Sequence, residues 1–429
     1  PGQFEIAPIF SISNVALDNN LLVMDILKKT ARQHGLICLL HEKPFDGING
    51  SGKHNNWSLT TDDGINLFKP GKKPENNSLF QLVLACTMAA VDTHAVLLRL
   101  AASNTGNDHR LGANEAPPAI ISMYLGDQVG DVVDQIIKNG EATSSLSSGE
   151  IDFGIKKLPK LEKDPTDRNR TSPFAFTGNR FEFRMVASSN SIGDVNTVLN
   201  AMMAEQFEKA VEVLSKADDF ETAVTEYTAK LMREHQRIIF NGNGYSEEWP
   251  VEAEKRGLPN CKSIVDAIPA LLDDTTIEMY GKFGILSKAE LAARKEILFE
   301  QYAGVRNIEA LTMVDMANKL IIPATVKYTK ELADTVLAVK GAGVDATIQA
   351  EMLADATAKL AEMKKAVKNL SEVTEKAANA GDAQAVAVAY KDEVMEAMAE
   401  LRKPADELEV VMPKEEWPMP TYGDLVFEL

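Results

Sequence analysis

Cysteine, aromatic residues and positive charge are all scarce in this chain of 429 residues. Its three cysteines, Cys38, Cys86 and Cys261, are far apart and show no C-x-x-C spacing, which argues against a disulfide framework or a thiolate zinc site. A reducing, cytoplasmic setting therefore fits best. The chain has 45 basic and 63 acidic residues, for a net charge of −18, which disfavours nucleic acid as the main partner.

Long uninterrupted apolar runs are also missing. The most apolar stretch, residues 80–102, contains Asp92, His94 and Arg99, so it indicates a buried helix and not a membrane span. No basic region followed by a short apolar run indicates secretion. The chain opens at Pro1 directly on an expected strand, and we expect it to be a truncated chain.

The residues that are present predict an α+β protein with a long helical C-terminal region. Up to residue 190, short β-type runs alternate with stretches of helical periodicity. The predicted strands span 4–10, 36–40, 54–59 and 180–186, and the predicted helices span 20–34 and 78–103. Beyond residue 190, apolar residues recur mostly at helical spacing.

This change of pattern predicts the domain organisation. We expect a mixed core over 1–190, helical completion of that domain over 191–322, a long helical hairpin over 323–411 and a tail over 412–429 that packs on the core. The hairpin is predicted as two helices that separate near Gly381. Residues 127–165 contain serine-rich and lysine-rich parts, which favour an insertion or a flexible loop.

The first polar cluster is the run N-G-S-G-K-H-N-N-W-S over residues 49–58. Its small residues let backbone N–H groups approach a ligand, and period-2 geometry then places His54, Asn56 and Ser58 on one face of a strand. The run lacks the spacing of a phosphate-binding P-loop, and Lys53 is followed by histidine where that motif needs serine or threonine.

The second cluster is R-F-E-F-R over residues 180–184. Alternation puts Arg180, Glu182 and Arg184 on one strand face. A carboxylate between two guanidinium groups suits a metal nucleotide, because the carboxylate holds the cation and the arginines hold phosphate or carboxylate oxygens. A salt-bridged, exposed strand face explains the same pattern and stays open.

Three further segments carry charged groups with possible roles in phosphoryl transfer. Arg168 and Arg170 lie shortly upstream of the second cluster, although a solvated turn also explains them. Arg110 and Glu115 surround a Gly-Ala turn that suits a closing loop. Glu5 lies on the predicted first strand, where a single carboxylate usually has no special role.

Taken in order, these clusters resemble the signature of the glutamine synthetases. The matching segments are G-Q-x-E at 2–5, N-G-S-G-x-H at 49–54, the N…R loop at 104–110 with E-A-P at 115–117, R-N-R at 168–170 and R-x-E-x-R at 180–184. The amino-acid sequences of residues 40–47, 53–58 and 417–425 resemble those of the type III branch of this family. The resemblance implies an antiparallel curved sheet or partial barrel with flanking helices, followed by the helical region.

The resemblance also implies a metal and nucleotide site. Glu5 would ligate one divalent metal, while His54 and Glu182 would ligate a second, as magnesium or manganese. Asn56, Ser58 and Arg180 would contact ATP, and Arg170 would stabilise the phosphoryl group in transfer. The family's other metal carboxylates precede the G-Q-x-E strand, so these residues imply only part of a site.

On the substrate side, Asn49, Gly50, Arg110 and Arg184 would bind glutamate, and Glu115 would shield the intermediate and take a proton from ammonium. The implied activity is ATP-dependent ligation of ammonia to glutamate through γ-glutamyl phosphate, in a dodecamer of two stacked hexamers. A related glutamate–amine ligase, a guanidino-phosphotransferase and a catalytically silent homologue remain alternatives.

Overall fold

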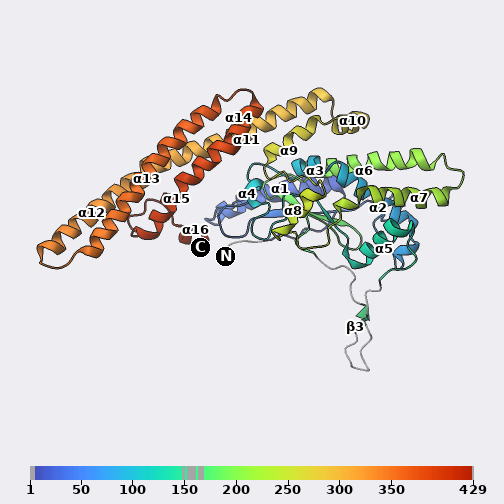
Figure 1. The fold of residues 1–429 in the computed structure, drawn as a ribbon, viewed down its shortest axis with the longest axis horizontal. Coiled ribbons are helices and arrows are strands. Elements are labelled where there is room, and N and C mark those ends of the chain that lie inside the picture. Colours follow the sequence, from blue (N-terminus) through green and yellow to red (C-terminus); the bar gives the residue numbers. More distant parts are fainter. Residues whose placement is uncertain (1–4, 147–149, 152–160, 163–168, 428–429) are drawn as a thin grey trace. The chain divides into compact units, whose positions relative to one another are not determined.

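The computed structural model describes residues 5–146, 150–151, 161–162 and 169–427. The chain forms two compact units. The first, here called the sheet unit, comprises Phe10–Lys295, and the second, the helical unit, comprises Pro1–Ile9 and Glu296–Leu429. The ribbon in Figure 1 is coloured along the sequence from blue to red, so most of the helical unit is drawn in orange and red.

A four-stranded mixed sheet lies at the centre of the sheet unit, in the order β1-β6-β5-β2. The strands are β1 (Gly52–Trp57), β2 (Met123–Tyr124), β5 (Phe174–Phe176) and β6 (Phe181–Ala187). Strand β6 is antiparallel to both β1 and β5, but β2 is parallel to β5. The expectation of an antiparallel sheet is therefore wrong at β2. A separate hairpin pairs β3 (Glu150–Ile151) with β4 (Leu161–Glu162).

Helices surround this sheet. They are α1 (Ser13–Gln33), α2 (Ser78–Thr93), α3 (Ala95–Ala101), α4 (Asn107–Arg110), α5 (Gly126–Asn139), α6 (Gly193–Leu214), α7 (Phe220–His235), α8 (Glu248–Lys255), α9 (Ile264–Ala267) and α10 (Asp274–Lys282), with 3-10 turns η1 (Pro74–Asn76), η2 (Gln236–Ile238) and η3 (Ile268–Leu272). The Asn77 side chain accepts a hydrogen bond from the Phe80 amide at 3.1 Å and so caps the start of α2.

The predicted helix over 78–103 is divided at His94. Helices α2 and α3 meet there at a bend of 77°. The buried His94 Nε2 lies 3.0 Å from the Glu205 carboxylate on α6, which gives the ring a polar partner inside the packed helices. Among the described residues no single helix is long and apolar enough to cross a membrane, and α2 and α3 meet that criterion only as a bent pair.

Aromatic side chains fill the core behind β6. Phe174 and Phe181 stack with ring centroids 4.6 Å apart, and Phe68 meets Phe181 edge-on at 5.2 Å. Phe183 is also fully buried. Because strand side chains alternate, this apolar anchor fixes the register of β6 and directs Glu182 and Arg184 to the opposite face.

The helical unit is built from long successive helices. Its elements are α11 (Lys288–Met316, which begins in the sheet unit), the π-helical turn η4 (Ala317–Ile321), α12 (Ile322–Gly341), α13 (Thr347–Ala378), α14 (Ala383–Ala389), the π-helical turn η5 (Tyr390–Val394), α15 (Met395–Val411) and α16 (Tyr422–Phe427). Helix α13 packs between α12 and α15 (Figure 1).

One detail of this unit agrees with the sequence prediction and a second corrects it. The predicted break near Gly381 is present, and the Asp382 side chain caps α14 by accepting from the Ala385 amide at 2.8 Å. A second turn, missed in the sequence, separates α12 from α13 at Gly343, whose φ is 76°. The region therefore contains three helical rods where a two-helix hairpin was predicted.

The described part of the tail contacts helices of this same unit. Trp417 is buried, and Glu416 accepts from Lys327 of α12 at 3.2 Å. Tyr422 receives a hydrogen bond from Arg402 of α15 at 2.9 Å. The domain boundaries themselves stay a prediction.

Three other predictions fail in the sheet unit and at the start of the chain. Residues 5–10 and 36–40 form no strand, because no strand among the described residues pairs with their backbone groups. The predicted insertion over 127–165 begins too early, since α5 buries Val129, Val133 and Ile136 in the core. Residues 147–149, 152–160 and 163–165 of that insertion lie outside the described residues.

Candidate active site

A bulge in β6 lies opposite the histidine of the predicted site, because Arg184 and Met185 together oppose His54 of β1. The register of β1 on β6 shifts between Lys53 and Asn55, on either side of His54. Such bulges re-aim side chains beside binding sites. Here His54 Nδ1 lies 2.8 Å from Oε1 of Glu182 on β6, so two predicted metal ligands from distant parts of the sequence are in contact.

The rest of β1 follows the predicted alternation. Asn55 and Trp57 are buried, whereas His54, Asn56 and Ser58 are exposed. Asn56 lies opposite Glu182 in the strand register. The exposed face of β1 therefore carries the predicted nucleotide contacts directly beside the histidine and carboxylate.

Glu182 is held between two basic side chains. Its Oε2 accepts a hydrogen bond from Arg184 at 2.7 Å, while Oε1 faces His54, and the residue is only 7% exposed. The hydrogen bond with His54, followed by that from Arg184, lowers the pKa of Glu182 to about 2 against the opposing effect of burial. The group is thus a carboxylate throughout the neutral pH range.

Arg184 connects β6 to the segment that contains Arg170. Besides Glu182, its guanidinium donates to the backbone carbonyls of Asn169 and Ser172, the latter at 3.3 Å. Arg184 is 3% exposed. The predicted glutamate-binding arginine therefore has a fixed position, and its donors are engaged by protein oxygens in this structure.

Arg110 is also buried. Its guanidinium donates to Asn107 Oδ1 at 3.3 Å and to the carbonyl of Arg184 at 3.1 Å. Burial lowers the pKa of Arg110 to about 10, and the charge of Glu42 opposes this shift. A Cβ atom on Gly52 would lie 2.0 Å from the guanidinium, so the start of β1 approaches this arginine closely only because residue 52 is glycine.

Two exposed loops meet at the predicted flap. Asn49 Nδ2 donates to Oε2 of Glu115 at 2.8 Å, and Asn114 Nδ2 donates to the Gly47 carbonyl at 3.1 Å. Among the described residues, Glu115 is the only one other than glycine with positive φ, at 53°. Backbone strain of this kind is concentrated at functional sites, which agrees with the predicted role of this loop.

Arg170 is exposed, and its segment is fastened to the loop over 241–245. Gly244 N donates to Thr171 Oγ1 at 2.7 Å, and Asn169 Nδ2 donates to the Gly242 carbonyl at 2.7 Å. The Tyr245 hydroxyl donates to the carbonyl of Arg170 at 3.3 Å. Arg168 lies outside the described residues.

Tyr245 is a residue of this region that the sequence prediction missed. Burial raises the pKa of its hydroxyl, and the charges of Arg184, Glu115 and Arg110 also act on it. Arg184 lies on β6, whereas Arg110 and Glu115 flank the same Gly-Ala turn, so charges from two site segments act on Tyr245. The run N-G-N-G-Y over 241–245 was the available signal, because paired glycines mark a close backbone approach.

Glu42 was missed as well. It is 1% exposed, and its Oε1 accepts from Asn104 Nδ2 at 3.0 Å and from the Ser189 amide at 2.9 Å. Its signal in the sequence was a charged pair, Glu42 and Lys43, a short distance before the glycine-rich cluster.

Predicted site residues at the strand ends and near the start of the chain are exposed. Ser58 directly follows β1 and Arg180 directly precedes β6, and both are exposed at the end where Trp57 pairs with Phe181. Glu5 belongs to the helical unit and is exposed. The functional roles of all these residues stay predictions.

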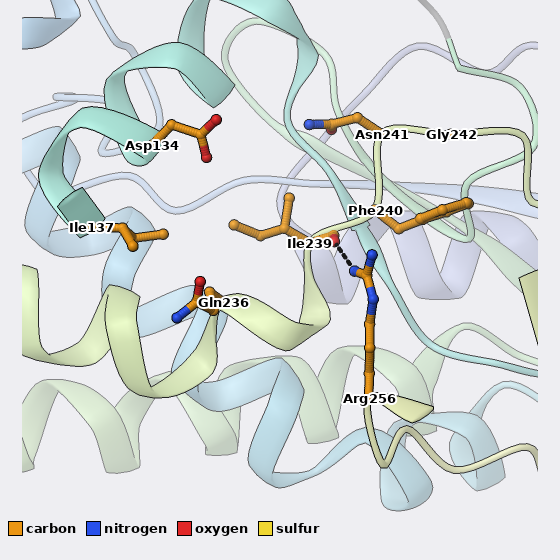
Figure 2. A pocket seen from close by; sticks show the side chains of 8 residues that line it. All are labelled: Asp134, Ile137, Gln236, Ile239, Phe240, Asn241, Gly242 and Arg256. Atoms are coloured by element: carbon orange, nitrogen blue, oxygen red, sulfur yellow. Dashed lines mark hydrogen bonds between the residues drawn. The ribbon is translucent and has the colours of Figure 1, made fainter. Parts of the chain in front are cut away.

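A pocket of about 370 Å³ is lined in part by Asn241 and Gly242 of the 241–245 loop (Figure 2). Figure 2 shows Asp134 and Arg256 at opposite sides of this pocket, with Asn241 at its rim. Arg256 donates to the Ile239 carbonyl at 2.8 Å and lies over the stacked rings of Phe240 and Trp249. None of the predicted site residues lines the pocket.

The residues present fit a divalent cation in part. A carboxylate and an imidazole are donors that magnesium and manganese accept, and Glu182 is ionised. However, no group of three or more His, Cys, Asp or Glu side chains in the described part of the chain is arranged to hold a metal. His54 and Glu182 would thus supply at most two protein ligands to a cation, and its further positions would require other oxygen atoms.

Comparison with known proteins identifies the family. A family model described as glutamine synthetase, catalytic domain, matches residues 1–122, and one described as glutamine synthetase C-terminal domain matches residues 223–340. The chain belongs to the glutamine synthetase family.

Three curated relatives match over the whole chain. Type-3 glutamine synthetase of Dictyostelium discoideum is 40% identical over 436 residues, which cover 59% of that protein. Glutamine synthetases of Butyrivibrio fibrisolvens and Bacteroides fragilis are 42% and 38% identical, with 61% and 60% of their lengths covered. The chain therefore spans about 60% of the length of these relatives.

Proposed function

We propose that the whole protein containing this chain ligates ammonia to glutamate while ATP is converted to ADP and phosphate, as a member of the type III branch. The observation that carries the proposal is the position of Glu182, between His54 and Arg184 on paired strands. This arrangement offers a metal-binding pair next to a fixed cation. The names of the relatives support the same activity.

In the first step, an oxygen of the glutamate γ-carboxylate attacks the γ-phosphorus of ATP, and the bond to the bridging oxygen breaks to release ADP. His54 and Glu182 would hold magnesium or manganese, which would neutralise charge on the ATP phosphates. Asn56, Ser58 and Arg180 bind the nucleotide from the exposed strand face. Arg170 approaches the phosphoryl group in transfer.

In the second step, ammonia attacks the γ-carbonyl carbon of γ-glutamyl phosphate, and the carbon–oxygen bond to phosphate breaks. Arg184 and Arg110 hold the two carboxyl groups of glutamate, and Asn49 and Gly50 line the same side. Glu115 accepts the proton that ammonium must lose and closes the loop against water. The Asn49–Glu115 hydrogen bond supports this closure, because it joins the two loops at 2.8 Å.

Several broader features belong to the same proposal. The four-stranded sheet is part of a curved partial barrel, and Glu5 ligates a second divalent metal. The proposed domain boundaries are those expected above, with a core over 1–190, its helical completion over 191–322, a region of three helical rods over 323–411 and a tail over 412–429. The whole protein works in the cytoplasm, in glutamine biosynthesis and nitrogen metabolism, as a dodecamer of two stacked hexamers.

The test is γ-glutamyl hydroxamate formation by the whole protein from glutamate, hydroxylamine and ATP with magnesium. Glu182→Gln keeps the shape of the side chain but removes the charge that binds the cation. We expect a loss of activity of roughly 100-fold, because metal sites respond strongly to altered ligands. Unchanged activity in this variant contradicts the metal assignment.

Glu205 offers a matched control. Its carboxylate also contacts a histidine, His94 at 3.0 Å, and a basic side chain, Lys209 at 3.0 Å. It belongs to α6, which contains none of the predicted site residues. Glu205→Gln should therefore leave hydroxamate formation within about threefold, provided that the variant is folded.

A further inference from the structure

Glu42 is a buried carboxylate in a segment without regular secondary structure. Its exposed fraction is 1%. A buried charge is costly unless hydrogen bonds and opposite charges compensate for it, so its partners indicate what it does. Those partners belong to three segments that carry predicted glutamate-binding residues or adjoin them.

The first contact is with the turn that follows β6. Glu42 Oε1 accepts from the Ser189 amide at 2.9 Å and from the Ser189 hydroxyl. This turn directly continues the strand that presents Glu182 and Arg184. The carboxylate therefore anchors the end of β6.

The second contact is with the segment before α4. Asn104 Nδ2 donates to Oε1 at 3.0 Å, and a Cβ atom on Gly106 would lie 2.4 Å from Oε2. Helix α4 follows Gly106 directly and ends at Arg110. The close approach at Gly106 thus fixes the start of the short helix that carries this arginine.

The third contact is with the glycine-rich cluster. The Ser51 amide donates to the Glu42 carbonyl at 2.7 Å, and a Cβ atom on Gly50 would lie 2.4 Å from the same oxygen. Backbone and side chain of one residue therefore hold Gly50, the turn after β6 and the segment before Arg110 in a fixed relation.

We propose that Glu42 is a positioning residue for the glutamate side of the site. Its buried carboxylate fastens the turn after β6 to the segment before Arg110, its backbone carbonyl holds the glycine-rich cluster, and the carboxylate supplies negative charge for the buried guanidinium of Arg110. This inference rests on the function proposed above. The surroundings of Arg110 support the electrostatic part of the proposal. Its guanidinium donates to uncharged oxygens of Asn107 and Arg184, and the charge of Glu42 is the first of those that raise its pKa.

The experiment measures KM for glutamate, KM for ATP and kcat of the whole protein in the hydroxamate reaction. Glu42→Gln keeps the side-chain volume and an acceptor for Asn104 and Ser189 but removes the charge. We expect KM for glutamate to rise about tenfold while KM for ATP changes less than twofold. A general loss of structure would raise both constants.

Gly106→Ala is the second variant, because it disturbs the contact between Glu42 and the segment before α4 without altering Glu42 itself. The added Cβ displaces the carboxylate, so KM for glutamate should rise in wild-type background and change little further when combined with Glu42→Ala. Glu205→Gln, the buried carboxylate control, should leave both KM values within twofold.

The outcomes separate the two proposals. Selective weakening of glutamate binding in Glu42→Gln or Gly106→Ala supports the positioning role. A wild-type KM for glutamate in folded variants, or equal changes for glutamate and ATP, overturns that role and leaves the proposed activity standing. Absence of product from the wild-type whole protein overturns the proposed activity, and the inference about Glu42 with it.

Discussion

At the scale of single residues, the candidate site is organised by buried charges with different partners. Glu182 contacts two basic side chains, whereas Arg110 is satisfied mainly by neutral oxygens. The first arrangement favours a permanently ionised carboxylate. The second keeps a cation at the site whose charge is only partly compensated by the protein, which suits a pocket for an anionic substrate.

The contact between Gly52 and Arg110 gives a prediction for stability. Gly52→Ala places a Cβ atom 2.0 Å from Arg110 Nη2, so the buried arginine or the strand must move. We expect a loss of about 1–3 kcal/mol in the free energy of unfolding, as in other overpacked sites. Urea denaturation of the chain measures this change.

Gly281→Ala is the matched control for that variant. Gly281 lies in α10, has no heavy atom within 4 Å of its added Cβ, and has no positive φ. Alanine favours helix by up to about 1 kcal/mol, so this variant should be neutral or more stable. Equal destabilisation by both substitutions contradicts the proposed clash.

The pKa of Glu182 gives a prediction for acid stability. Because that pKa is lowered from 4.5 to about 2, the folded state gains stability above pH 4.5 and loses it as the pH falls toward 2. Glu182→Gln removes this dependence. The difference in unfolding free energy between wild type and variant should therefore shrink from pH 5 to pH 2.5, and a difference independent of pH would show that the carboxylate is not stabilised by its charge.

At the scale of elements, local periodicity predicted some structures well and others not at all. The alternation in β1 was correct in burial, and the alternation in β6 was correct in residue type, because Phe181 and Phe183 enter the aromatic core although every residue of that strand is buried. The strands predicted over 4–10 and 36–40 failed, because strand pairing depends on partners that local sequence does not identify. Glu42 was missed for a related reason, since its partner Ser189 lies 147 residues away.

The turn between α12 and α13 provides a test at this scale. Gly343 has φ of 76°, and Asp345 accepts from the Thr347 hydroxyl at 2.7 Å where α13 begins. Gly343→Ala should cost about 1 kcal/mol, because side chains disfavour the left-handed region. Gly341→Ala, two residues earlier in the last turn of α12, meets no atom within 4 Å and should be neutral or stabilising.

Thermal unfolding followed by circular dichroism compares these two variants. The prediction requires a lower midpoint for Gly343→Ala than for Gly341→Ala. The opposite order would mean that the turn does not depend on the left-handed conformation of Gly343.

At the scale of the whole molecule, ordered motifs predicted the family, whereas local patterns did not predict the assembly of the site. Five short motifs spread over residues 2–184 resemble the family signature, and the comparisons confirm the family. The fold then brings His54 and Glu182 into contact across a sequence separation that only the pairing of β1 with β6 explains.

The most direct test of the central claim is anomalous diffraction from crystals of the whole protein with manganese and a non-hydrolysable ATP analogue. The account predicts a manganese peak within coordination distance of both the His54 imidazole and the Glu182 carboxylate, next to the phosphates of the nucleotide. Manganese and nucleotide bound elsewhere, with the His54–Glu182 contact intact and no metal beside it, would contradict the proposed site.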